Sequence, residues 1–223
     1  MVGPLRTGLP RLIGPKLEGR GYQRCWPWPA SATTLDVAEV QLNQPGPPII
    51  NLRGDRVALG PLCRQLLPLY QRWNNDFEVG YTTLGMRILT GEAMAEWYRR
   101  HSDEERAVSF TVYELPGLRP IGTTGLFDID RQHRRAEFGI RIGEKSCWGK
   151  GYGAEVTRLV LSYGFTSLNL HSVMLWVVGY NERGIRAYAR AGFRLIGRRR
   201  EAYRLGGKAY GVVFMDCLAA DLR

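Results

Sequence analysis

The chain has 223 residues, 44% of them hydrophobic, which is enough for one domain with a core or for a domain with a tail. Lysine and arginine outnumber aspartate and glutamate by 31 to 21. The resulting charge of +10 favours an anionic partner such as nucleic acid, a ribosome-associated protein or a polyphosphate cofactor.

Cysteine and histidine usage argues against a metal centre. The four cysteines include no CxxC pair and the three histidines are scattered, so we expect no bound metal. No apolar run approaches the roughly 20 residues that cross a bilayer, so we expect no membrane association. The cysteines are unpaired, which is typical of the reducing cytoplasm. Prolines interrupt every apolar stretch near the N-terminus, so this segment does not resemble a signal peptide, and we expect a cytoplasmic protein.

The first part of the chain differs in composition from the rest. Eight of the twelve prolines fall within the first 48 residues. Proline fixes φ and removes a backbone donor, so regular elements are hard to build there. We therefore expect residues 1–48 to form a Pro/Gly-rich N-terminal extension and residues 49–223 to form the functional domain.

From residue 49 onward, hydrophobic periodicity alternates between the strand and the helix pattern. This order predicts an α/β (α+β) fold, a mixed sheet with helices on both faces. The expected elements are a strand over 49–59, helices over 62–73 and 92–101, strands over 107–114, 120–129 and 135–142, a helix over 153–168, a strand over 172–178, a helix over 181–191, and a hairpin of strands over 193–205 and 210–218.

A glycine-rich segment joins the strand over 135–142 to the next helix. Gly149, Gly151 and Gly153 allow a sharp turn and a close approach to a ligand. The free N–H groups and the positive end of the helix dipole form an anion site. No Ser, Thr, Asp or Asn within 149–154 caps these groups, which suits an external pyrophosphate. The P-loop and Rossmann fingerprints are both absent, and an ordinary glycine turn is the alternative.

The helix over 181–191 carries a second candidate pair. Asn181 and Tyr188 are seven residues apart, about two helical turns, so both side chains face one side of the helix. The alternatives are that Asn181 only caps the helix and that Tyr188 is only a core aromatic residue. Gly192 stands where a helix C-cap is expected.

Three segments together resemble the GNAT superfamily of acetyltransferases, and within it the ribosomal-protein N-terminal acetyltransferase and spermidine N-acetyltransferase branch. They are Arg134–Ile140, Trp148–Gly153 and Asn181–Phe193, and Trp73–Val79 looks like the acceptor-side loop of the same branch. The resemblance spans residues 49–218. It implies a mostly antiparallel twisted sheet of about six to seven strands, acetyl-CoA as co-substrate, and direct attack of a primary amine on it in a ternary complex.

The resemblance also implies roles for single residues. Tyr188 would protonate the departing thiolate, which suits a phenol with a pKa near 10. Many superfamily members begin the loop with Gln or Arg, where this chain has Trp148, so one polar contact to the coenzyme is in question. The residues expected to bind the coenzyme are Ile140, Arg141, Ile142, Trp148, Gly149, Lys150, Gly151, Tyr152, Gly153, Ala154, Asn181 and Arg190.

The base that deprotonates the amine is assigned to Glu137, because superfamily enzymes often use a glutamate on this strand. Glu137, Gly139 and Arg141 share one strand face, so an ion pair of Glu137 with Arg141 or Arg135 is the alternative. The residues expected to hold the acceptor are Asn74, Asp76, Glu78 and Asp128, with solvated turn residues as the alternative for the acids.

The acceptor is the least determined part of the function. The charge of +10 favours the N-terminal amine of a protein or peptide, with nucleic acid involved only indirectly through a ribosomal substrate. A small amine such as a polyamine or an aminated antibiotic is the alternative, and a non-catalytic acyl-CoA-binding module is a third. A nucleic-acid-binding protein is disfavoured because basic and aromatic residues do not interleave. The sequence leaves homodimer formation open.

Overall fold

The computed structural model of the chain describes residues 46–83 and 87–222. The expected N-terminal extension lies almost wholly outside the described residues, so the division at residue 48 stays a prediction. None of the described helices is long and apolar enough to cross a membrane.

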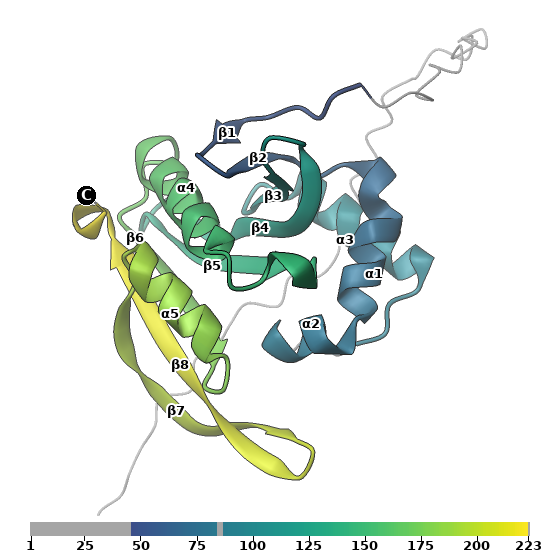
Figure 1. The fold of residues 1–223 in the computed structure, drawn as a ribbon. Coiled ribbons are helices and arrows are strands. Elements are labelled where there is room, and N and C mark those ends of the chain that lie inside the picture. Colours follow the sequence, from purple (N-terminus) through teal and green to yellow (C-terminus); the bar gives the residue numbers. More distant parts are fainter. Residues whose placement is uncertain (1–45, 84–86, 223) are drawn as a thin grey trace, which may run out of the picture. The chain divides into compact units, whose positions relative to one another are not determined.

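The described domain is built on one eight-stranded sheet in the order β1-β2-β3-β4-β5-β6-β8-β7 (Figure 1). All neighbouring strands are antiparallel except β5 and β6, which run parallel. The strands are β1 (Leu52–Arg53), β2 (Val57–Pro61), β3 (Val108–Glu114), β4 (Arg119–Asp130), β5 (Arg135–Ile142), β6 (Ser172–Val178), β7 (Arg194–Leu205) and β8 (Lys208–Leu218).

Helices pack on both faces of this sheet because its strands alternate between two apolar surfaces. On β3, Phe110 and Val112 join the main core, whereas Thr111 between them faces the opposite side, where its Oγ1 lies 2.5 Å from the Tyr70 hydroxyl. The helices are α1 (Leu67–Asn75), α2 (Phe77–Thr83), α3 (Gly91–Asp103), α4 (Tyr152–Thr166) and α5 (Glu182–Ala191). Helix α4 supplies Val156 and Val160 to the main core, and α1 and α3 form a second core on the other face.

The expected fold class is confirmed, with two corrections at the start of the domain. The single strand expected over 49–59 is wrong: β1 and β2 form a short hairpin, so the sheet has eight strands rather than six to seven. Helix α2 was expected to be a loop. It begins at the Asp76 carboxylate, which accepts hydrogen bonds from the backbone N–H groups of Glu78 (2.9 Å) and Val79 (3.2 Å).

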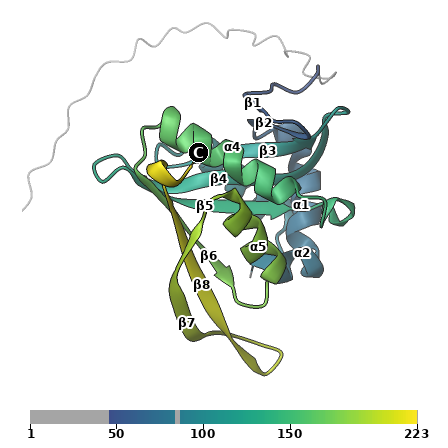
Figure 2. The same cartoon turned by 60° about the vertical axis from the view of Figure 1, so that its left-hand side comes forward.

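The C-terminal elements follow the sequence expectation closely. The Asn181 side chain caps α5 by accepting a hydrogen bond from the Gly184 N–H at 2.9 Å, and Gly192 ends the helix with φ of 116°. Gly206 and Gly207, both with positive φ, turn the chain between β7 and β8. This hairpin projects away from the rest of the sheet (Figure 2).

Pairing between β5 and β6 ends early. Residues 135–137 pair with residues 172–174, and no pair follows along the remaining five residues of β5. In the register with β4, the backbone groups of Ile140 and Ile142 point away from β4, toward the opening that this separation leaves. The two strands therefore open the sheet at its centre.

The segment after β5 packs closely against α1. We therefore expect an added side chain at Gly143 to destabilise the fold. A Cβ at this position would lie 2.1 Å from Cγ of the Trp73 indole. We expect Gly143→Ala to lower the free energy of unfolding by about 1–3 kcal/mol, as overpacking does elsewhere. Urea denaturation measures this. Gly197→Ala is the control, because a Cβ there meets nothing within 4 Å, and equal losses in both variants would contradict the packing argument.

Candidate active site

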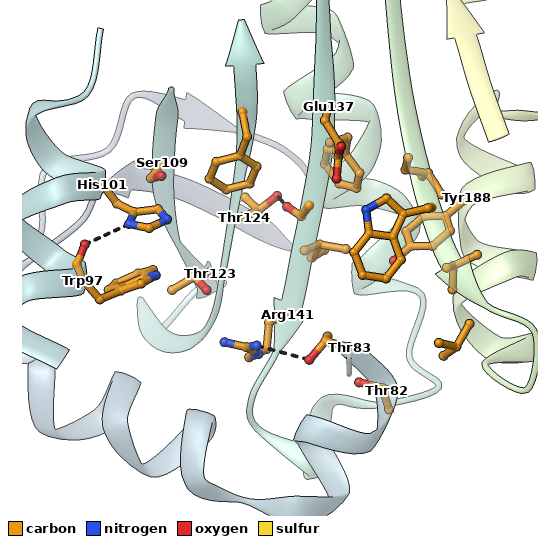
Figure 3. Close-up of a pocket in the computed structure, with 18 of the residues that line it drawn as sticks. Thr82, Thr83, Trp97, His101, Ser109, Thr123, Thr124, Glu137, Arg141 and Tyr188 are labelled. Atoms are coloured by element: carbon orange, nitrogen blue, oxygen red, sulfur yellow. Dashed lines mark hydrogen bonds between the residues drawn. The ribbon is translucent and has the colours of Figure 1, made fainter. Parts of the chain in front are cut away.

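Two cavities meet at the opening between β5 and β6. The first, of about 310 Å³, runs between the glycine loop and α5 and is called here the loop cavity. The second, of about 230 Å³, lies over the face of β5 and is called here the central cavity (Figure 3). The residues that line both are Thr82, Thr83, Ile140, Arg141 and Tyr188. The two cavities are therefore neighbouring parts of one site.

The glycine loop presents an open helix N-terminus to the loop cavity. Gly151 caps α4 with φ of 85°, and no side chain accepts from the first N–H groups of the helix. A Cβ at Gly149 would meet nothing within 4 Å, so the space in front of the loop is free. Free amide donors, the helix dipole and absent side chains fit a pyrophosphate.

The back of this loop is anchored by a residue that the sequence did not single out. Arg56 donates from Nη1 to the Lys150 carbonyl (2.9 Å) and from Nε to Glu155 Oε2 (3.0 Å). The backbone N–H of Arg56 also donates to Glu155 Oε1 at 2.8 Å. Lys150 itself is exposed and does not line the loop cavity. Arg56 thus fixes the loop from the side opposite the ligand.

Trp148 fills the place where many superfamily members carry a polar residue. Its indole Nε1 donates to the Ile142 carbonyl at 2.8 Å, and the Arg183 guanidinium lies 3.9 Å from the centre of the ring. One acceptor on the open edge of β5 is therefore already bonded within the protein. The stacked pair links the glycine loop to the first turn of α5 through a cation–π contact.

The other residues expected to bind coenzyme lie along the same cavity. Asn181 lines it and also donates from Nδ2 to the Thr82 carbonyl at 3.1 Å, so it connects α5 to the end of α2. Arg190 lines it one turn beyond Ala187. The structure thus brings together all the expected coenzyme-binding residues except the side chain of Lys150. Their individual roles stay predictions.

Tyr188 lies where the two cavities meet. Its ring packs edge-on against Phe138 (6.1 Å between centroids) and Phe193 (6.2 Å), and it contacts the main core. Burial raises the pKa of its hydroxyl to about 12. The phenol is therefore protonated at neutral pH, as a proton donor has to be.

Glu137 lines the central cavity without any ion pair among the described residues. Arg135 pairs with Asp130 at 3.4 Å, and Arg141 donates to Asn74 and Thr83. The ion pair weighed as the alternative role of Glu137 is thus absent from the described structure. Burial raises the pKa of Glu137; the Trp176 side chain partly offsets this, and the charge of nearby Asp128 adds to it.

The four residues expected to hold the acceptor are not brought together. Lys145 Nζ lies 2.9 Å from both Asp76 and Glu78, and its hydrogen bond lowers the pKa of Asp76. Asn74 accepts from Arg141, and Asp128 is exposed on a bulge of β4. None of the four lines either cavity. Asp76 and Glu78 instead neutralise a lysine at the end of β5.

Several residues of the central cavity were not foreseen. Thr82 and Thr83 were not predicted as site residues because α2 was expected to be a loop. Asp76 is a typical N-cap residue and could have indicated this helix. The remaining lining comes from separate elements and shares no motif: Trp97 and His101 on α3, Phe127 on β4 and Trp176 on β6. Among residues 46–83 and 87–222, no group of three or more His, Cys, Asp or Glu side chains is arranged to hold a metal ion.

Comparison with known proteins decides the family. Residues 56–194 match the family described as Acetyltransferase (GNAT) domain. The chain belongs to the GNAT acetyltransferase family. The expected superfamily is confirmed, and the chain is an N-acetyltransferase that uses acetyl-CoA as its co-substrate.

The GNAT relatives include polyamine enzymes. The spermidine N(1)-acetyltransferase of Escherichia coli (strain K12) is 32% identical over 159 residues, which cover 71% of this chain and 84% of the relative. That of Vibrio cholerae is 31% identical over 127 residues, covering 57% and 72%. The crystal structure of spermidine N-acetyltransferase from Vibrio cholerae in complex with CoA and spermine aligns with a TM-score of 0.70 at 26% identity, over 76% of this chain and 99% of that chain.

The glycine loop gives a direct test of the coenzyme site. In Gly151→Val, a branched side chain would strain a backbone with φ of 85° and press on Arg56, whose Nη2 lies 3.2 Å from the position of a Cβ, so the loop expected to hold the pyrophosphate would be displaced. We expect acetyl-CoA affinity measured by calorimetry to fall at least about tenfold, the effect of about 1.4 kcal/mol. Gly206→Val imposes a similar strain at φ of 56° in the distant β7–β8 turn and should bind normally. Unchanged affinity in a folded Gly151→Val protein would remove the loop from the site.

Proposed function

We propose that the chain acetylates a small primary amine that enters the central cavity. The observation that carries this proposal is the Glu137 carboxylate, which lines a cavity of about 230 Å³ without a cationic partner among the described residues. A carboxylate with a raised pKa is suited to accept a proton from an ammonium group. The names of the spermidine relatives support a small amine more than the protein N-terminus expected from the charge.

Acetyl-CoA supplies a thioester carbonyl that an amine can attack. Glu137, directly or through a water molecule, removes the proton that a primary amine carries at neutral pH. The amine nitrogen then forms a bond to the carbonyl carbon and the carbon–sulfur bond breaks. Tyr188, which lines both cavities, gives its proton to the departing sulfur, and the second proton lost by the nitrogen returns through solvent to the resulting phenolate and restores the phenol.

A panel of acceptors tests the proposal. The full chain would be assayed for acetyl-CoA consumption with polyamines, aminoglycosides, free amino acids, simple amines and N-terminal peptides. We expect a small amine to give the highest kcat/KM. If a peptide N-terminus exceeds every small amine, the proposal fails in favour of the protein acceptor, and if no amine is acetylated, catalysis itself is overturned.

Tyr188→Phe separates proton donation from packing. The ring stays against Phe138 and Phe193, so the melting temperature and acetyl-CoA affinity should change little. Loss of the hydroxyl should lower kcat about 10²-fold, the lower end for a general acid, because a thiolate is a fairly good leaving group. Tyr163→Phe, whose ring packs on Phe110 in the same core, is the matched control. A kcat within twofold of the parent, with chemistry limiting, would exclude Tyr188 as the donor.

The raised pKa of Glu137 predicts a pH dependence. A base is inactive when protonated, so kcat/KM should fall as the pH drops through the pKa of Glu137, which lies above that of an exposed glutamate. Glu137→Gln should remove this acid limb and lower kcat/KM about 10²–10⁴-fold. Glu96→Gln, an exposed change on α3, should leave the profile intact. An acid limb that persists in Glu137→Gln would assign the base to another group.

A further inference from the structure

Arg141 carries a charge that the described protein does not balance. Its Nη1 donates to Asn74 Oδ1 (2.5 Å) and its Nη2 to Thr83 Oγ1 (3.1 Å), whereas its buried Nε has no hydrogen-bond partner. Both partners are neutral. Among residues 46–83 and 87–222, no carboxylate lies within ion-pair distance of this guanidinium.

The surroundings make this imbalance costly. Desolvation lowers the pKa of Arg141, so the position disfavours the charge that an arginine always carries. A buried charge without a counter-charge is strongly destabilising unless a partner arrives. Glu137 lies four residues away on the same strand, about 13 Å along it, and Figure 3 shows the two side chains at opposite ends of the cavity.

A second buried polar atom in the central cavity also lacks a partner. Ser109 on β3 lines the cavity, and its buried Oγ has no hydrogen-bond partner among residues 46–83 and 87–222. Buried polar groups are rarely left unpaired in folded proteins, so each one calls for an explanation. A polar ligand in the cavity would supply hydrogen-bond acceptors to both Arg141 Nε and Ser109 Oγ, and would therefore account for both unpaired atoms.

We propose that the acceptor amine carries a carboxylate close to its amino group, as an amino acid does, and that Arg141 binds this carboxylate. This inference rests on the proposed function and names the class of its substrate. Nη1 and Nη2 each already donate one hydrogen bond, whereas Nε has no partner among the described residues, and the Nε–H is one of the parallel N–H donors with which a guanidinium binds a carboxylate.

The position of Arg141 determines where the carboxylate lies in the acceptor. Arg141 and Tyr188 both line both cavities, so Arg141 stands beside the point where amine and thioester meet. A group bound there is only a few bonds from the reacting nitrogen, and the proton of that nitrogen then reaches Glu137 through water rather than directly. The rest of the lining combines the rings of Trp97, Phe127 and Trp176 with polar residues such as His101, Thr123 and Thr124. The three rings suit an apolar or aromatic side chain on the acceptor.

The same charges disfavour a polyamine. Glu137 is the one carboxylate that lines the central cavity in the described part of the chain. Asp76 and Glu78 lie outside the cavity and form ion pairs with Lys145. A second ammonium group would approach Arg141, which repels it. The net charge of +10 also attracts anionic rather than polycationic molecules.

Matched acceptor pairs test this inference. The full chain would be assayed with L-phenylalanine, L-tryptophan, L-leucine and L-methionine, each against its amide and its carboxyl-free amine, and with spermidine. We expect the best acceptor to be a free amino acid, with kcat/KM at least about tenfold above its amide and its carboxyl-free amine, since a charged hydrogen-bond partner is lost. A carboxyl-free amine, an amide or spermidine as the best acceptor would overturn the inference and leave the proposed function standing.

Variants of Arg141 test whether this side chain binds the carboxylate of the acceptor. Arg141→Gln should lower the ratio of kcat/KM for the amino acid to kcat/KM for the carboxyl-free amine at least about tenfold, so that the preference disappears whatever the change in activity common to both acceptors. Arg141→Lys keeps the positive charge and should retain part of the preference for the amino acid. A retained preference also shows that loss of the guanidinium does not act only by unfolding the protein. Arg135→Gln, an exposed loss of charge on the same strand, should keep the full preference. Equal losses on both acceptors in folded Arg141→Gln would assign Arg141 to the coenzyme or to the fold and refute the inference.

Discussion

The early end of the β5–β6 pairing is the constraint on which the site depends. Parallel strands need a crossover, here through α4, and three paired residues hold β5 and β6 together before they separate. Backbone groups of Ile140 and Ile142 then face an opening instead of a neighbouring strand. Because α4 directly follows the carboxyl end of β5, its uncapped N-terminus lies at the same opening. A strand edge and an anion site thus become continuous, which is the arrangement that an extended coenzyme with a pyrophosphate requires.

Contacts between segments about 100 residues apart bound this opening. The Tyr180 hydroxyl donates to the Tyr81 carbonyl at 2.8 Å, and Asn181 donates to the Thr82 carbonyl. Helices α2 and α5 therefore meet beside the opening, and Tyr188 on α5 lines both cavities; Figure 3 shows it in the lining of the central cavity. Asn181 caps α5 through its side-chain oxygen and joins this helix to α2 through its side-chain nitrogen, and its expected contact with the coenzyme stays a prediction.

Most charged side chains around the site form ion pairs within the protein, and those without an ion pair are available to a ligand. Lys145 neutralises Asp76 and Glu78, Arg56 holds Glu155, and Arg135 holds Asp130. Within the described part of the chain, Glu137 and Arg141 have no counter-charges; they share one face of β5, with Gly139 between them. A glycine there leaves the floor between the two charges free of a side chain. The relatives named for spermidine share the fold, and a shared fold does not by itself determine the acceptor.

The sequence by itself determined the elements and groups whose signals are local. Hydrophobic alternation set most of the strands, Asn181 and Gly192 set the ends of α5, and Gly149, Gly151 and Gly153 indicated the anion site, because propensity, capping and positive φ act within a few residues. Only the tertiary structure decided that Asp76 and Glu78 pair with Lys145, that Arg56 anchors the glycine loop and that Arg141 lacks a counter-charge. These outcomes depend on which side chains the folded sheet brings within a few ångströms, and spacing along the chain does not encode that distance.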